Sequence, residues 1–355
     1  MLVKSSGVTH YDKQRATPGF TLFSPIDSEI AKIVNMEGET VQQWELERGG
    51  TNCCCLTDNG NLFIAEKSPE GPKLSSGKSG LMREYDWDGN VVWEHHDPNQ
   101  HHDARRLPNG NTLYIAWSPL DVETANNVKG GIPGTEYKNG RDVIFEDVLR
   151  EVDPNGNVVW EWHSSALDMD KYEICPLCRR HEWAHANTCA PLANGDVMVS
   201  YRVLNLLIIV DRQTGEIKWE HHDINLGHQH DCQMLNNSNV LVFCNGYHGS
   251  RKFYSRVQEF KPETGEIVWE YQGDPILSFY SPHISGMQRL AGGNTLICEG
   301  GKGCIFEVTP EGDVVWEFIN DINGDNIEFG PINWVFRATR YATDDPRLQG
   351  RLSNP

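Results

Sequence analysis

The chain consists mostly of short runs in which apolar and polar residues alternate, and six of these runs end in Trp followed by Glu. Alternation of Val, Ile, Leu and Trp with polar residues is typical of strands that are half-buried in a sheet. Successive Trp-Glu pairs are separated by 47 to 67 residues. A period near 50 residues made of strands and turns predicts a radial array of small sheets. The six tryptophans are Trp44, Trp93, Trp160, Trp219, Trp269 and Trp316.

The turns between the runs support the same fold class. Asn-Gly and Thr-Gly pairs recur in LPNGN, DPNGN and KPETGE, and they supply the positive φ that tight hairpins require. No segment has a long apolar stripe with a 3.6-residue period, so no major helix is predicted. Six units of roughly four strands predict an all-β, six-bladed β-propeller. The 67-residue unit leaves a seventh blade as the geometric alternative.

The two ends of the chain are predicted to close the propeller. Residues 19–25 (GFTLFSP) and 334–341 (WVFRATRY) are strand-like and flank the six units. Pairing them in one blade would remove exposed sheet edges. We therefore expect a single domain over residues 1–355, with an N-terminal arm at 1–18 and inserted loops at 119–143 and 164–182.

Charge and hydropathy limit the function classes. The chain has 31 basic and 50 acidic residues and a net charge of −19, which argues against nucleic-acid and anionic-membrane partners. No stretch is apolar enough to span a bilayer, and the first residues contain no apolar segment of the kind found in export signals. The sequence therefore predicts a cytoplasmic protein that acts on a small anionic or aromatic substrate.

The ten cysteines do not form the regular pattern of a disulfide scaffold, so reduced thiols are predicted. Cys175 and Cys178 in CPLC, followed by His181, have a spacing typical of zinc ligands. A closed zinc site needs a fourth ligand, and the sequence does not assign one. A plain or redox-sensitive loop is the favoured interpretation.

The histidines recur in register when the units are aligned on the turn position held by Gly110, Gly195, Ser238 and Gly293. Positions two apart on a strand share a face, so the aligned side chains are predicted to project together from the start of each first strand. These strands line the central channel of a propeller, and the side chains should therefore meet at one channel mouth. Ten residues before the turn are Gln100, His185, His228 and His283, and eight before it are His102, Asn187, His230 and Ser285.

An arginine and an amide accompany the histidines. Asn187 follows His185 by two residues, and Arg202 ends the strand that begins near His185. Arg offers a planar fork of donors for sulfate, phosphate or carboxylate oxygens. An acidic protein that places these groups around one channel mouth is predicted to bind a small anion there.

This pattern resembles the bacterial arylsulfate sulfotransferase family and the broader arylsulfotransferase-like group. The segments that carry the resemblance are His185–Glu220 and Gly227–Gly246, with an H-x-N element, an arginine after the next strand, and Q-H-D in the following blade. The resemblance implies a six-bladed propeller that moves a sulfuryl group between phenols through a sulfohistidine, without a metal or a nucleotide sulfate donor. Studied members are periplasmic, whereas this sequence shows no export signal.

The resemblance also implies roles for individual residues. His185, Asn187 and Arg202 would hold the sulfuryl oxygens, with His102 as a supporting imidazole from the preceding blade. His230 is the first choice for the nucleophile. The predicted catalytic residues are His230, His185, His102 and His283, of which His283 is the competing candidate for the nucleophile. The predicted substrate-binding residues are Asn187, Arg202 and His228.

Two other functions remain open at this point. Converging neutral imidazoles make a good site for zinc, copper, iron or manganese, with Asp103 or Asp231 orienting them. That alternative is a metal-dependent hydrolase, lyase or oxidase. The third possibility is a propeller scaffold without catalysis. In the metal alternative the ligands would be His102, His185, His228, His230 and His283.

Overall fold

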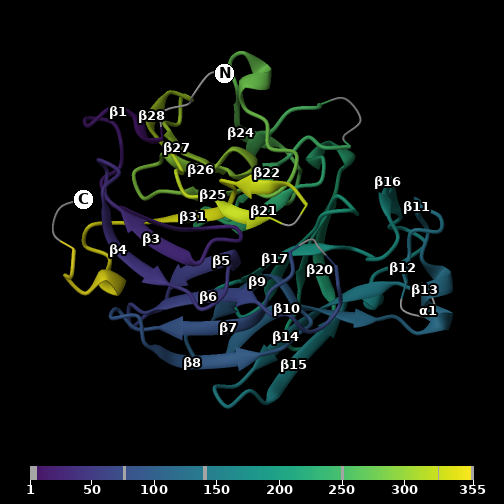
Figure 1. Cartoon of the computed structure of the whole chain (residues 1–355). Helices are drawn as coiled ribbons and strands as arrows, with labels where there is room; N and C mark the ends of the chain where they lie inside the picture. Colours follow the sequence, from purple (N-terminus) through teal and green to yellow (C-terminus); the bar gives the residue numbers. More distant parts are fainter. Residues whose placement is uncertain (1–5, 75–76, 139–141, 249–251, 327, 353–355) are drawn as a thin grey trace. The chain divides into compact units, whose positions relative to one another are not determined.

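Each strand that carries a Trp-Glu pair is the fourth strand of an antiparallel four-stranded sheet, and one of these sheets is extended by a fifth strand. The computed structural model describes residues 6–74, 77–138, 142–248, 252–326 and 328–352. Its contacts divide the chain into two compact units (Figure 1). Unit 1 comprises Met1–Pro98 with Tyr271–Pro355, and unit 2 comprises Asn99–Glu270.

Unit 1 holds three of the sheets. The strands of the first sheet, in spatial order, are β31 (Val335–Tyr341), β2 (Phe20–Pro25), β3 (Ile30–Val34) and β4 (Thr40–Glu45). Those of the second are β5 (Gly50–Leu56), β6 (Leu62–Lys67), β7 (Gly80–Tyr85) and β8 (Val91–His96). Those of the third are β25 (Gly286–Arg289), β26 (Thr295–Glu299), β27 (Cys304–Val308) and β28 (Val314–Ile319), and β1 (Gly7–Tyr11) extends this sheet beyond β28. A separate hairpin pairs β29 (Gly324–Asn326) with β30 (Gly330–Ile332).

Unit 2 holds the other three sheets. Their strands are β9 (Gln100–Arg106), β10 (Thr112–Pro119), β14 (Phe145–Val152) and β15 (Val158–His163); β17 (Ala186–Pro191), β18 (Val197–Tyr201), β19 (Leu206–Val210) and β20 (Ile217–His222); and β21 (His230–Met234), β22 (Val240–Cys244), β23 (Arg256–Phe260) and β24 (Ile267–Gln272). Six sheets of four strands, one of them extended by a fifth at its edge, confirm the predicted class, an all-β six-bladed β-propeller.

The predicted pairing of the chain ends in one sheet is confirmed. β31 pairs with β2 in antiparallel register, from Phe20 opposite Tyr341 to Pro25 opposite Val335. The arm before residue 19 also contributes a strand that was not predicted. β1 pairs with the outer edge of β28, with Gly7 opposite Ile319.

Tryptophans of the repeat connect neighbouring sheets. In unit 1 the Trp44 indole N–H donates to the Asp86 carbonyl at 2.8 Å, and that of Trp316 donates to Met36 at 2.8 Å. In unit 2 the Trp219 indole donates to Pro262 at 2.9 Å. Each acceptor lies in the turn before the fourth strand of the next sheet. These three repeat tryptophans therefore have packing roles.

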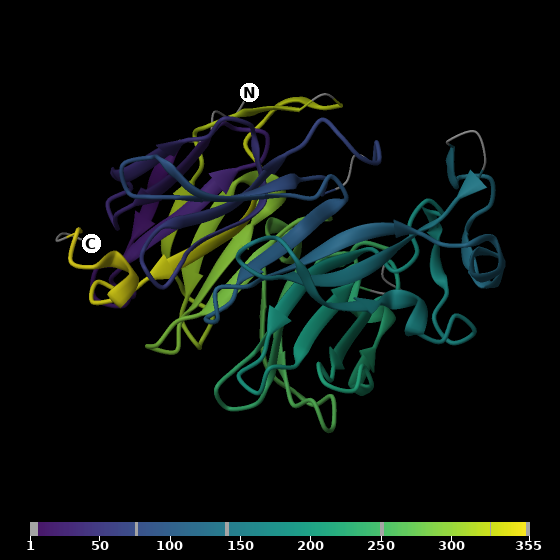
Figure 2. The same ribbon diagram turned by 90° about the horizontal axis from the view of Figure 1, so that it is seen from below.

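The two predicted insertions both lie in unit 2 and pair with each other. The first contains α1 (Val122–Asn127), β11 (Gly130–Ile132), β12 (Tyr137–Lys138) and β13 (Asp142–Val143), and the second contains β16 (Ile174–Arg179). β11 and β16 form a two-stranded parallel sheet. Both views show these elements as one group at the edge of unit 2 (Figure 1 and Figure 2).

Helical structure is limited to short segments, and none of the described helices is long and apolar enough to cross a membrane. The core lies between the faces of neighbouring sheets. In unit 2, Met198 and Leu207 of one sheet pack with Cys232 and Val242 of the next. The 3₁₀ turns are η1 (Ser164–Ala166), η2 (Ile224–Leu226), η3 (Ile276–Ser278), η4 (Gly300–Lys302) and η5 (Pro346–Leu348).

Candidate functional site

Three first strands of unit 2 bring the main cluster of functional side chains together. β9 packs against β17, and β17 packs against β21. Each strand carries a bulge, at His102–Asp103, at Asn187 and at Asp231 respectively. Bulges turn side chains away from the regular alternation and are common beside functional sites. We call the buried cluster at these bulges the histidine site; it contains His101, His102, Asp147, Glu182, His185, His230 and Asn245.

The bulges interrupt the regular alternation of side chains from which a common face for the histidines was predicted. His185 lies just before β17 and His228 lies two residues before β21, both with left-handed backbone at φ 55° and 62°. His102 is also left-handed at φ 52°. The two-residue period therefore does not apply at these positions, and the side chains go where the local backbone directs them.

His185 is held by a carboxylate. Its Nδ1 lies 2.8 Å from Oε2 of Glu182, whose other oxygen accepts the indole N–H of Trp117. Burial opposes ionisation of Glu182, but the nearby imidazoles of His185 and His181 outweigh it and hold the pKa of this carboxyl well below its usual value. Glu182 is therefore an ionised carboxylate that binds Nδ1 of His185.

His102 is held by a second imidazole. Its Nδ1 lies 2.8 Å from Nδ1 of His101, and its ring meets the His185 ring edge-on at 4.7 Å between centroids. His101 stacks on Trp117 at 4.3 Å and places Nε2 3.3 Å from Oδ1 of Asp147. Burial, with the charges of His185 and His101 next, lowers the pKa of His102 well below 6.5. His102 is therefore a neutral imidazole at neutral pH.

The low pKa of His102 predicts a pH dependence of stability. Below the unfolded-state pKa of about 6.5, the unfolded chain binds a proton that the native state excludes, so acid favours unfolding. This one group should cost about 1.4 kcal/mol per pH unit between about 6.5 and its folded pKa. We expect His102→Asn to lose less stability than wild type between about pH 7.5 and about pH 5.5 in urea unfolding. Equal losses in the two proteins would contradict this assignment.

His230 is held by an amide. Its Nδ1 lies 2.9 Å from Oδ1 of Asn245, in the turn after β22. An amide oxygen only accepts, so Nδ1 carries the hydrogen and Nε2 of the neutral ring carries a lone pair. The electrostatic effect of His230 contributes to the lowered pKa of His102, so the third imidazole belongs to the same site.

Asn187 is partly engaged by the protein. Its side-chain NH₂ donates to the Gln229 carbonyl at 2.8 Å, which leaves one N–H for a ligand. Gln229 in turn donates to Ser200, Tyr201 and Leu206, so it ties β21 to the preceding sheet. The amide of the H-x-N element therefore has a structural bond as well as its predicted binding role.

Arg202 lies in the turn that follows β18, as the sequence indicated. Its backbone N–H donates to the His185 carbonyl at 3.0 Å, which fixes the turn to the histidine site. Its guanidinium lies 5.9 Å from the centre of the Tyr247 ring. Burial lowers the pKa of Arg202 from 12.5, and the Cys178 thiol beside it acts in the opposite direction.

His228 departs from the predicted group. Its Nε2 lies 3.9 Å from Sγ of Cys178, and its ring meets that of His248 at 4.8 Å. His181, which the sequence spacing placed with the cysteines, lies 3.3 Å from Glu182. We call Cys175, Cys178, His228 and His248 the thiol–imidazole cluster.

His283 belongs to unit 1, where its ring meets Trp334 edge-on at 4.6 Å. It precedes β25 by three residues, close to the place of His228, which precedes β21 by two.

Within the described ranges, two groups of three or more ligand-type side chains bring their donor atoms within 4.8 Å of one another. One is His101, Asp147 and Glu182, and the other is the thiol–imidazole cluster. Of the five histidines predicted as ligands in the metal alternative, only His228 belongs to either group. Asp103, offered there as an orienting carboxylate, instead pairs with Arg105 at 2.9 Å and accepts the Cys189 N–H at 3.0 Å.

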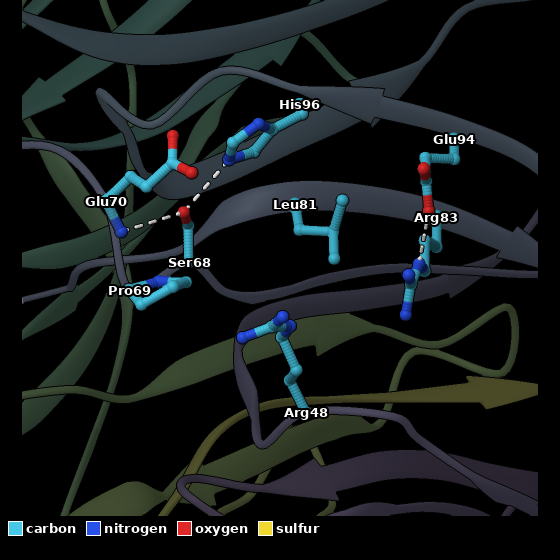
Figure 3. A pocket seen from close by; sticks show the side chains of 8 residues that line it. All are labelled: Arg48, Ser68, Pro69, Glu70, Leu81, Arg83, Glu94 and His96. Carbon is cyan, nitrogen blue, oxygen red and sulfur yellow. Dashed lines mark hydrogen bonds and ion pairs between the residues drawn. The ribbon is translucent and has the colours of Figure 1, made fainter.

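A separate pocket of about 230 Å³ lies in unit 1 and contains none of the predicted residues. Figure 3 shows Arg48 pointing into it and the contacts of Ser68 with His96 and of Arg83 with Glu94. Ser68 Oγ lies 2.9 Å from His96 Nε2. Glu47 also pairs with Arg83, which neutralises much of the positive charge there. The pocket therefore does not provide the anion site that the sequence predicts.

Several residues in or beside the histidine site are not among those predicted from the sequence, although the sequence carries a signal for some of them. Trp117, Arg202 and Asn245 all lie seven residues after the aligned turn position; Trp117 is inside the second strand of its sheet, and the other two follow directly after theirs. Extending the same alignment forward would have found Trp117 and Asn245. Glu182 and Asp147 come from a loop and a third strand, and nothing in the repeat indicates that they reach the site.

The fold and the site define a six-bladed β-propeller with buried, hydrogen-bonded histidines. Residues 56–224 match the sequence model of the arylsulfotransferase (ASST) family, which confirms the predicted resemblance over a segment that includes His102 and His185 and ends before His230. Residues 146–326, just over half of the chain, match the model described as outer membrane protein assembly factor BamB. The chain belongs to the propeller family of that description. Membership establishes the blade architecture, whereas the activity has to be inferred from the site.

No curated protein matches the chain significantly. A solved protein of unknown function from Bacteroides caccae is 18% identical and has a TM-score of 0.57, over 91% of this chain and 99% of its own. A streptogramin B lyase structure is 10% identical and has a TM-score of 0.51, over 92% of this chain and 87% of its own. At these identities the similarity establishes the fold alone.

Proposed function

We propose that the protein is a group-transfer enzyme of the arylsulfotransferase type, which moves a sulfuryl group from an aryl sulfate to a phenol through a sulfated histidine. The observation that carries the proposal is the difference between two imidazoles of one buried site. Glu182 lies behind His185, and the neutral amide of Asn245 lies behind His230. A charged acceptor behind one imidazole and a neutral acceptor behind the other suit the two rings to different roles, proton exchange and nucleophilic attack.

The first half-reaction uses both imidazoles. The lone pair on Nε2 of His230 attacks the sulfur, and an N–S bond forms as the S–O bond to the aryl group breaks. The departing phenolate takes a proton from Nε2 of His185, whose protonated ring Glu182 stabilises through Nδ1. A sulfated His230 and a neutral His185 remain.

The second half-reaction reverses these roles. Neutral His185 removes the proton from the acceptor phenol, whose oxygen attacks the sulfur while the N–S bond breaks. His230 regains its lone pair and His185 its proton, so protons and electron pairs balance over the cycle. Negative charge on the three sulfuryl oxygens would be stabilised by Arg202, the remaining N–H of Asn187 and neutral His102.

Steady-state kinetics test this proposal. With nitrophenyl sulfate and phenol we expect nitrophenol and phenyl sulfate in equal amounts, without a nucleotide sulfate donor. Double-reciprocal plots at several phenol concentrations should be parallel, because a covalent intermediate separates the two substrates. Release of nitrophenol that never yields phenyl sulfate would contradict transfer, and intersecting lines would contradict the covalent route.

A further inference from the structure

The thiol–imidazole cluster lies outside the reaction described above and is built from three separate segments of unit 2. Cys175 and Cys178 belong to β16, His228 precedes β21, and His248 follows β22. One ligand atom from each of the four lies within 4.8 Å of the others. Two thiols and two imidazoles are the donor set of structural zinc sites, and the C-x₂-C spacing is typical of them.

The distances fit a tetrahedral ion. Zn–S bonds of about 2.3 Å and Zn–N bonds of about 2.0–2.1 Å place S and N donors roughly 3.6 Å apart at the tetrahedral angle. Cys175 Sγ lies 3.5 Å from His248 Nδ1, and Cys178 Sγ lies 3.8 Å from the same atom and 3.9 Å from His228 Nε2. Shifts of a few tenths of an ångström would bring all three distances to the expected value.

The backbone leading to the two histidines is arranged to bring them together. The Gly227 carbonyl accepts the Tyr247 N–H at 2.9 Å, and a Cβ on Gly227 would lie 2.6 Å from the Gly246 Cα. His228 and His248 follow these glycines with left-handed φ of 62° and 55°. Non-glycine residues adopt this conformation at an energetic cost that clusters at functional sites. A Cys175–Cys178 disulfide would give no reason for both imidazoles to face the sulfurs.

The site would also fasten an insertion to the blades. β16 pairs with β11, and the Cys175 N–H donates to the Val203 carbonyl at 3.0 Å, next to Arg202. Tyr247, over which the Arg202 guanidinium lies, stacks on the His248 ring at 3.9 Å between centroids. We propose that Cys175, Cys178, His228 and His248 form a closed zinc site that fixes the β16 segment to the sheet β21–β24, beside Arg202.

Elemental analysis of protein purified from zinc-supplemented cells tests the proposal. We expect one zinc ion per chain in wild type, and loss of it in Cys178→Ala and His248→Ala. His181→Ala should retain zinc, although sequence spacing favours His181 as a ligand, and His222→Ala, which changes an exposed histidine, should retain it too. Absence of zinc from wild type, retention in both cluster variants, or a Cys175–Cys178 disulfide in the native protein would overturn the site.

A second measurement guards against variants that fail to fold. Wild type grown with cobalt should show the visible absorption of tetrahedral cobalt with thiolate ligands, and zinc should displace it. An octahedral cobalt spectrum, or none, would also overturn the site. The outcome is independent of the proposed transfer reaction, because zinc content is read without substrate. Protein with zinc and no transfer activity would support this site while refuting the proposed function.

Discussion

His230→Ala is expected to abolish sulfuryl transfer and to lower kcat/KM by at least about 10⁴-fold, equivalent to roughly 5.5 kcal/mol of transition-state stabilisation. The variant removes the proposed nucleophile, whose Nε2 lone pair is defined by the Nδ1 contact with Asn245 at 2.9 Å. Without it no covalent intermediate can form. The rate is to be measured with nitrophenyl sulfate and phenol.

Two matched variants make this result specific. His283→Ala, at the competing histidine, should keep most of the activity, and so should His222→Ala on the exposed end of β20. If His283→Ala were inactive and His230→Ala active, the nucleophile would be His283 and the assignment from Asn245 would be wrong. Circular dichroism of each variant establishes that it is folded.

Glu182→Gln is expected to lower kcat by about 10²- to 10⁴-fold with little change in KM. The glutamine keeps the shape of the side chain, but it removes the charge that stabilises a proton on His185, 2.8 Å away. Glu182 is a positioning residue, because it acts through His185.

The dependence on the leaving group separates this role from a purely structural one. Nitrophenolate leaves readily without a proton, whereas a more basic phenolate needs one. The loss in Glu182→Gln should therefore be larger with phenyl sulfate than with nitrophenyl sulfate. An equal loss for both donors would show that Glu182 maintains the fold of the site and has no part in proton transfer.

Much of the fold could be predicted because the signals are local. The Trp-Glu strands and Gly-centred turns define each sheet, and the pairing of β31 with β2 follows from strand-like ends. The β11–β16 pair could not be predicted, since it joins two irregular insertions separated by a whole hairpin. Such pairings depend on loop geometry that short-range patterns do not encode.

The site was predictable in part, and the bulges explain the rest. His102, His185 and His230 share a site as aligned, because β9, β17 and β21 are neighbouring first strands. His228 aligned with His185, but its Nε2 lies 3.9 Å from Sγ of Cys178, and a strand period cannot place side chains on left-handed backbone such as that of these two residues. The carboxylate of Glu182 reaches the site from a loop, where the repeat has no counterpart.

The most direct test of the account is to expose the protein to nitrophenyl sulfate without any acceptor and to map the product by peptide mass spectrometry. The account predicts that one SO₃ group remains on the chain, that fragmentation places it on His230, and that added phenol removes it as phenyl sulfate. Protein that releases nitrophenol without becoming sulfated, or that carries the group on another residue, would contradict it.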